Sequence, residues 1–190
     1  QKTMFFCYNY AIQLKFFEFG RHLIDIDTTI VHKQYRRLIQ DNTQLNEVYA
    51  LKCPDHMMSL PSIRKVFPNS KFIWIHRDPF HSLLSYCSMV NSVWELFLGD
   101  TDKKEVGRFV LTLFDQMIRN TINYRKSMDI DIIDVSYNDL IDRREILVEN
   151  LGKKLNRNIN ISNKGKNSKF FKNKYNKDRY DYGISREDVD

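Results

Sequence analysis

An arginine and a serine eight positions apart form the most informative pattern in this chain. Arg77 follows an apolar run at residues 72–75, and Ser85 lies in a segment of helical periodicity. A guanidinium is a planar, permanently charged donor that suits a phosphate, and a hydroxyl adds one further donor. The pair therefore predicts a site for a phosphate-bearing ligand. The alternative is that Arg77 pairs with Asp78 or another carboxylate and that Ser85 only caps a helix.

The residues around Arg77 predict a strand, a sharp turn and a helix. The apolar run at residues 72–75 is typical of a buried strand. Pro79 is tolerated in a first helical turn, and Asp78 directly before it can cap that helix. Apolar residues then recur at helical spacing: Phe80, Leu83, Leu84 and Val90. Arg77 is thus expected at the carboxyl end of a strand, where open α/β sheets bind ligands.

This segment resembles the 3′-phosphate-binding motif of the sulfotransferases, which use 3′-phosphoadenosine-5′-phosphosulfate (PAPS). In that family a strand ends in Arg, and a Ser eight positions later binds the same 3′-phosphate. Arg77 and Ser85 match in type and spacing. Three further blocks are similar to the family in the same order, so the resemblance covers about residues 33–190. They are residues 51–56 with 66–69, residues 135–140, and residues 174–175 with 182–185.

The resemblance also implies roles for single residues in sulfuryl transfer. Arg77 and Ser85 would orient the donor, and Tyr137 would lie against the adenine; a Tyr packed at a helix entry is the alternative. Lys52 could stabilise charge on the leaving phosphate if it ends a strand beside Arg77, but surface lysines are commoner. His56 is the best candidate for the base, because imidazole titrates near neutrality. The alternative for His56 is a histidine that caps or fills a helix start, and a carboxylate from an upstream segment could then serve as the base.

One family element is missing from the sequence. Sulfotransferases carry a Gly-rich loop that cradles the 5′-phosphosulfate through backbone N–H groups. None of the six glycines lies in such a motif, and Gly20 is the only glycine before Lys52. We therefore interpret the chain, which starts at Gln1, as a piece of a longer sulfotransferase. The alternative is a catalytically inactive relative that binds a nucleotide or an acidic glycan.

Alternating strands and helices predict an α/β fold with a mainly parallel sheet. The resemblance implies a P-loop-NTPase-like three-layer domain, incomplete at its N-terminus. We expect strands at residues 48–51, 72–75 and 130–135. We expect helices at residues 5–19, 29–45, 56–67, 79–90, 103–126 and 137–155, and a last helix from residue 182.

We expect one domain in residues 1–156. Its first part, residues 1–47, should be helical, and residues 48–156 should contain the sheet and the nucleotide site. Residues 157–190 then form a basic C-terminal extension of the same domain. A length of 190 residues with 42% hydrophobic residues suits one globular domain with a real core.

The net charge of +6 is concentrated near the C-terminus. Residues 153–180 hold ten lysines and arginines against one aspartate. Such a segment attracts a bisphosphorylated nucleotide, an acidic glycan or nucleic acid, unless it is only a solvated tail. It lacks the regular aromatic residues of a stacking platform, and no helix-turn-helix or zinc signature appears, so we expect no nucleic-acid partner.

The three cysteines, Cys7, Cys53 and Cys87, form no Cys-x-x-Cys pair. We expect reduced thiols, no metal site and a cytoplasmic location. No run of about 20 apolar residues is present, so we expect no membrane span in this stretch. PAPS is the expected co-substrate, and the acceptor is a hydroxyl of a small molecule, a lipid, a carbohydrate or a tyrosine.

Overall fold

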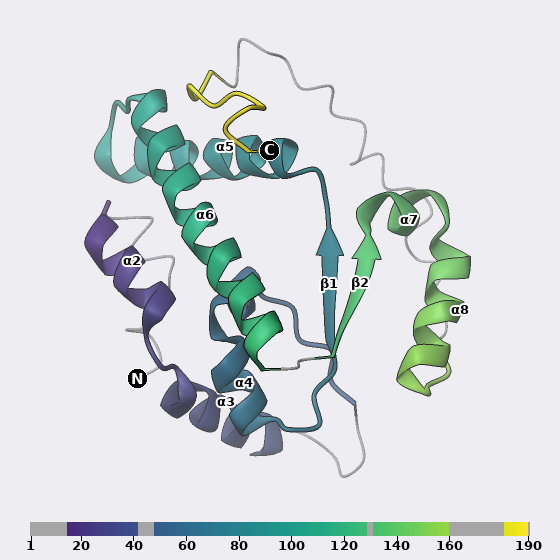
Figure 1. The fold of residues 1–190 in the computed structure, drawn as a ribbon. Helices are drawn as coiled ribbons and strands as arrows, with labels where there is room; N and C mark the ends of the chain where they lie inside the picture. Colours follow the sequence, from purple (N-terminus) through teal and green to yellow (C-terminus); the bar gives the residue numbers. More distant parts are fainter. Residues whose placement is uncertain (1–14, 42–47, 129–130, 160–180, 190) are drawn as a thin grey trace.

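The computed structural model describes residues 15–41, 48–128, 131–159 and 181–189 (Figure 1). The helices begin with α2 (Phe17–Asp25), α3 (Thr29–Asp41), the 3-10 helix η2 (Pro54–Ser59) and α4 (Leu60–Val66). They continue with α5 (Pro79–Leu98), α6 (Lys103–Ser127), α7 (Tyr137–Asp142) and α8 (Arg144–Leu155). The strands are β1 (Phe72–His76) and β2 (Ile132–Ser136). None of the helices in these ranges is both long and apolar enough to cross a bilayer.

The two strands form a parallel pair. Their register runs from Phe72 opposite Ile132 to His76 opposite Ser136. A parallel pair needs a long crossover, which α5 and α6 supply here. Both carboxyl ends therefore lie at one edge, where β1 leads into α5 and β2 into α7, with α6 on one side of the pair and α8 on the other (Figure 1). The α/β class and the strands expected at residues 72–75 and 130–135 are confirmed.

The helix starts follow the expected cap chemistry. The Asp78 side chain accepts the His81 backbone N–H at 2.9 Å, with Pro79 in the first turn of α5. Asp27 likewise accepts the Thr29 N–H at 2.8 Å at the start of α3. Such caps satisfy amides that have no partner inside the helix. The predictions of α5 and α6 are also confirmed, and the helix expected at residues 56–67 is present as η2 followed by α4.

One strand prediction was wrong, and a second was wrong in part. Residues 48–53 have no regular secondary structure, so the strand expected at residues 48–51 is absent. A strand requires a hydrogen-bonding neighbour, which an apolar run cannot provide by itself. The strand at residues 72–75 exists but is not buried on both faces, because Ile73 and Ile75 are 45% and 48% exposed. Trp74, on the other face, is half-buried.

Two helix predictions also need correction, and a third lies mostly outside the described residues. The helix expected at residues 137–155 is broken at Arg143, whose φ of −131° and ψ of 35° lie outside the helical region. The last helix expected from residue 182 is a turn, in which the Ser185 N–H and hydroxyl both bind Asp188 at 2.7 Å. Of the helix expected at residues 5–19, residues 1–14 lie outside the described part, and α2 begins at Phe17.

The main core lies between α2, α5, α6 and η2. Trp94 of α5 is fully buried, and its ring centroid lies 5.9 Å from that of Phe17 and 5.6 Å from that of Phe109. The Lys15 ammonium lies 4.4 Å from the Trp94 ring centroid. This packing fixes α5, and therefore the loop between β1 and α5, relative to α6.

Candidate functional site

Arg77 and Tyr137 meet at the carboxyl edge of the strand pair. The β1–β2 register, continued by one residue, places these two residues opposite each other. The Arg77 guanidinium carbon lies 4.8 Å from the centroid of the Tyr137 ring, which is a cation–π distance. Arg77 is exposed, and Tyr137 is half-buried. Two residues 60 positions apart in sequence are thus brought together where α/β sheets bind ligands.

The carboxylate of Asp78 contacts both the α5 cap and the C-terminal segment. One oxygen accepts the His81 N–H, and the other lies 3.3 Å from a guanidinium nitrogen of Arg186. The pKa of Asp78 is held below its usual value, first by the His81 amide and then by the charges of His81 and Arg186. Asp78 is therefore an ionised cap that is also tied to the C-terminal segment.

Ser85 lies on the exposed surface of α5. It lies six positions after Pro79, which corresponds to about 9 Å along a helix axis. It therefore points outward from the same helix that begins beside Arg77. Its contact with a phosphate stays a prediction.

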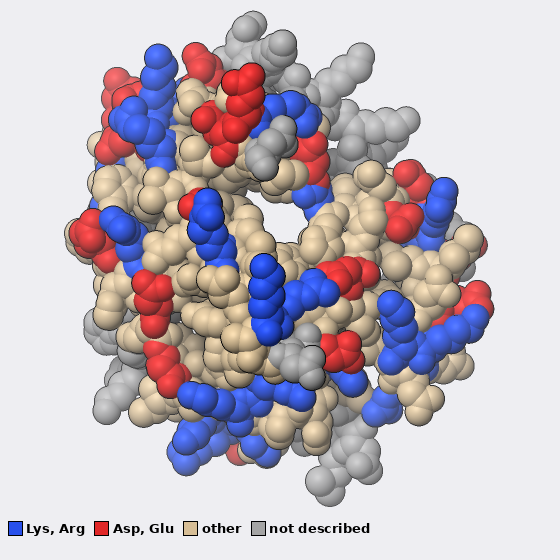
Figure 2. Space-filling model, viewed as in Figure 1, with Lys and Arg blue, Asp and Glu red and all other residues tan. Residues whose placement is uncertain are grey.

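An opening lies beside these elements. Figure 2 shows it between α5, α6 and the carboxyl end of β1. Lysine and arginine side chains border part of it in this view. The Arg77 edge is therefore accessible to a ligand from solvent.

Neither of the two predicted catalytic residues, Lys52 and His56, lies at the end of a strand. Lys52 is exposed and lies in the irregular segment 48–53, so the expectation that it ends a strand beside Arg77 was wrong. His56 lies in η2 and is half-buried. Burial lowers the pKa of His56 below its usual value of 6.5, and the nearby charge of His32 lowers it further. The imidazole of His56 is consequently neutral at pH 7, which is the form that accepts a proton.

Asp55 is a candidate that the sequence analysis missed. Burial raises the pKa of this carboxyl above its usual value. It lies near Tyr86 of α5, whose pKa is raised mainly by burial and also by the charge of Asp55. A carboxylate whose pKa is raised toward neutrality can act as a base. The only signal in the sequence was its place between Pro54 and His56, at a helix start.

A polar cluster joins both strands to α6. His76 Nε2 lies 2.7 Å from Asp134 Oδ1, and Arg125 donates to both oxygens of Asp134 at 2.7 and 2.6 Å. The Trp74 ring stacks on His76 at 5.0 Å between centroids. Arg125 above all, and then His76, hold the pKa of Asp134 well below its usual range. His76 is therefore part of a polar cluster at the end of β1.

This cluster predicts a pH-dependent contribution to stability. A folded-state pKa below the unfolded value of about 3.9 means that ionised Asp134 stabilises the fold above that pH and stops doing so as the pH falls. Asp134→Asn should therefore lower the free energy of unfolding at pH 7, and the difference from wild type should shrink below about pH 4. Urea unfolding at pH 7, 5 and 3 measures this. A difference of equal size at all three pH values would contradict it.

Asp131→Asn is the matched control for that experiment. Asp131 lies just before β2, is more exposed than Asp134 and has one ion pair, with Lys71 at 3.6 Å. Exposed single ion pairs contribute little to the free energy of unfolding. Its replacement should leave the free energy of unfolding nearly unchanged at every pH.

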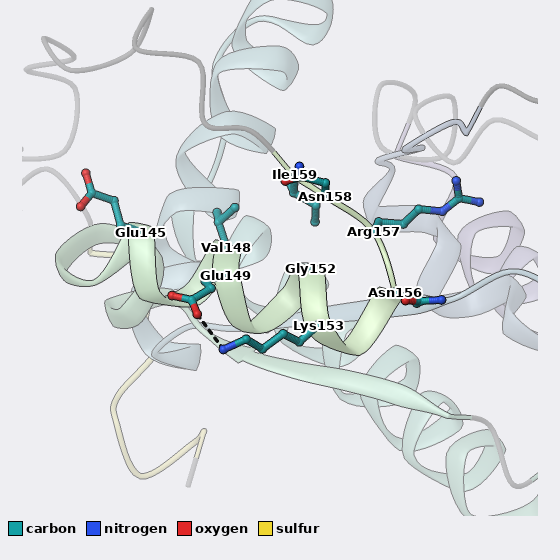
Figure 3. A pocket seen from close by; sticks show the side chains of 9 residues that line it. All are labelled: Glu145, Val148, Glu149, Gly152, Lys153, Asn156, Arg157, Asn158 and Ile159. Atoms are coloured by element: carbon teal, nitrogen blue, oxygen red, sulfur yellow. Dashed lines mark hydrogen bonds and ion pairs between the residues drawn. The ribbon is translucent and has the colours of Figure 1, made fainter.

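Two cavities lie elsewhere. One, of about 620 Å³, is a groove along α8 lined by Glu145, Val148, Glu149, Gly152, Lys153 and residues 156–159 (Figure 3). Its Glu149 and Lys153 neutralise each other at 2.6 Å, and the Arg157 side chain points away from them (Figure 3). The other, of about 230 Å³, lies between α2 and α6. Neither cavity is lined by any of the five predicted site residues.

The described residues contain no group of three or more His, Cys, Asp or Glu side chains that could hold a metal ion.

Comparison with protein families gives one match. The model of the sulfotransferase family matches residues 12–159, which is well over half of the chain. The matched region contains Lys52, His56, Arg77, Ser85 and Tyr137, and it ends before residues 181–189. No curated protein and no solved structure matches the chain.

Proposed function

The chain belongs to the sulfotransferase family, and we propose that it transfers a sulfuryl group from PAPS to a hydroxyl acceptor. The observation that carries this proposal is the contact of Arg77 with Tyr137 at the carboxyl edge of the parallel pair. A nucleotide with a 3′-phosphate needs a cation for the phosphate and a flat surface for the base. Both are present at one place, beside an opening in the surface (Figure 2).

Arg77 and Ser85 bind the 3′-phosphate in this proposal, and Tyr137 contacts the adenine. The guanidinium of Arg77 is fixed by the Tyr137 ring, so little side-chain freedom is lost when a phosphate binds. We also propose the three-layer, P-loop-like arrangement for this domain. The described residues contribute one parallel pair of strands to it.

The transfer itself requires a base and a neutralising charge. The acceptor oxygen forms a bond to sulfur, the bond from sulfur to the phosphate oxygen breaks, and the electron pair stays on that phosphate oxygen. His56 takes the acceptor proton, because it is neutral at pH 7. Lys52 offsets the charge on the leaving phosphate from its irregular segment. Asp55 is the second candidate for the base.

The lowered pKa of His56 predicts how the transfer rate changes at acid pH. Because its pKa lies below 6.5, the transfer rate at saturating substrate should be constant from about pH 7 upward and should fall only at pH values below 6.5. The profile of the rate constant kcat between pH 5 and 8 measures this. His56→Gln should remove that acid limb together with most of the rate, whereas His22→Gln, an exposed residue of α2, should change neither. An unchanged limb in His56→Gln would assign the base to Asp55.

A second function, nucleotide binding without transfer, is favoured by one observation. None of the glycines lies in a phosphosulfate-cradling loop. The two functions differ in turnover: both predict binding of 3′,5′-bisphosphoadenosine, but only an enzyme releases it from PAPS in the presence of a hydroxyl acceptor.

A cytoplasmic location also stays a prediction; it rests on the free thiols of Cys53 and Cys87.

The test is calorimetric titration with 3′,5′-bisphosphoadenosine, compared with adenosine 5′-phosphate. The two ligands differ only in the 3′-phosphate. Tighter binding of the bisphosphate is expected. Equal affinities, or no binding of either ligand, would contradict the proposal. PAPS turnover with small-alcohol, sugar, lipid and tyrosine-peptide acceptors then separates the enzyme from the binding module and identifies the acceptor class.

A further inference from the structure

The last described segment, residues 181–189, is held against the α5–α6 pair. We call it the strap. Tyr182 is 3% exposed and packs in the core, and Ile184 and Val189 pack at its margin. Gly107 of α6 leaves room for it, since a Cβ there would lie 1.9 Å from the Tyr182 carbonyl oxygen. In Figure 1 the strap, drawn in yellow, lies over α5.

Arg186 connects the strap to the turn that carries Arg77. Its guanidinium lies 3.3 Å from Asp78 Oδ2 and 5.0 Å from the centroid of the Phe80 ring. The other oxygen of Asp78 accepts the His81 N–H of the α5 cap. One carboxylate therefore joins the strap to the first turn of α5, across 108 positions of sequence.

The position of Asp78 makes this contact relevant to ligand binding. Asp78 follows Arg77 directly and is ionised. A carboxylate beside a phosphate site repels the phosphate unless a cation offsets its charge. Arg186 offers that cation, and its contact with Phe80 holds it in place.

We propose that Arg186 is a positioning residue for the nucleotide site: through Asp78 it fixes the turn that carries Arg77 and offsets the carboxylate charge beside the bound phosphate. This inference rests on the proposed function. It adds a residue outside the region that the family model matches, because that match ends at residue 159. Arg186 does not touch the phosphate in this arrangement. It acts through Asp78.

The test is titration of the whole chain with 3′,5′-bisphosphoadenosine, at low salt and at 0.5 M salt. Arg186→Ala should raise Kd about fivefold at low salt, the range of an exposed ion pair, and less at high salt. Arg186→Lys keeps the charge and should restore most of the affinity. Arg108→Ala is the matched control, since Arg108 is an exposed α6 arginine 3.9 Å from Asp102. A role in folding alone would lower the free energy of unfolding of Arg186→Ala and leave the Kd of the folded protein unchanged.

A second variant tests the strap as a unit. Gly107→Ala should displace Tyr182 and with it Arg186, and so should raise Kd at least as much as Arg186→Ala. Hydrogen exchange at the backbone amides of residues 80–83 should become faster in both variants, with or without ligand.

The outcomes separate this inference from the proposed function. Tight binding by wild type with an unchanged Kd in Arg186→Ala would overturn the role of Arg186 and leave the function standing. No binding by wild type would overturn both. Equal loss of affinity in Arg186→Ala and Arg186→Lys, independent of salt, would show that the charge on Arg186 is not what the site requires.

Discussion

Replacing Trp94 with alanine is expected to lower the free energy of unfolding by about 3–5 kcal/mol, the usual cost of removing a large aromatic side chain from a core. Trp94 is fully buried between Phe17 and Phe109 and joins α2, α5 and α6. Its loss opens a cavity at the contact that fixes α5 on α6. Domains have only about 5–15 kcal/mol of stability in total, so this change removes a large share of it.

Urea unfolding followed by circular dichroism measures the effect. Leu96→Ala is the matched control, because Leu96 lies two residues later on the same helix and is 78% exposed. Its replacement should change the free energy of unfolding by less than about 0.5 kcal/mol. If Trp94→Ala does not fold, Trp94→Phe should show a smaller loss in the same direction. Equal effects at positions 94 and 96 would show that α5 is not packed as described.

The elements that the sequence predicted well are those whose determinants are local. The α5 start was predictable because Asp78 and Pro79 act within one turn. The long helix α6 was predictable because apolar residues recur at helical spacing from Val106 to Met117. The strand before Arg77 was predictable because its apolar residues form one continuous run at residues 72–75. Local patterns are sufficient where the cap, the periodicity and the turn all agree.

The errors concern features that depend on distant partners. The segment at residues 48–51 has strand-like residues, but no strand pairs with it in the described part of the chain. The exposure of Ile73 and Ile75 depends on which helices cover β1, and a run of apolar letters does not contain that information. Tertiary context overrides local propensity in both cases.

The two residues at the centre of the candidate site could be predicted from the sequence, but the residues around them could not. Arg77 and Tyr137 each follow a strand, and a parallel pair brings the residues after its strands to one edge. Arg186 could not be predicted, since it reaches Asp78 from 108 positions away. Asp55 was missed because its raised pKa results from burial in the folded chain. The residues that follow strands could therefore be identified from the sequence, whereas the residues that other elements bring to them could not.

Arg77→Ala is expected to weaken binding of 3′,5′-bisphosphoadenosine by about 1.5–3 kcal/mol, the range for hydrogen bonds to charged groups, which is roughly 10- to 150-fold in Kd. Affinity for adenosine 5′-phosphate should change much less, because this ligand has no 3′-phosphate for Arg77 to bind. Arg77→Lys should recover only part of the loss, since an ammonium cannot offer two parallel donors. Arg143→Ala, an exposed arginine between α7 and α8, is the control for a general loss of positive charge.

The comparison of the two ligands separates recognition of the 3′-phosphate from other effects of the substitution. Loss of the Tyr137 contact would disturb the adenine side and weaken both ligands alike. Loss of a phosphate donor weakens only the bisphosphate, and this loss diminishes as salt screens the charge. Calorimetry with the four proteins and both ligands measures the difference. If Arg77→Ala weakens both ligands equally, Arg77 supports Tyr137 and the phosphate is bound elsewhere; if it weakens neither, the edge of the β1–β2 pair is not the nucleotide site.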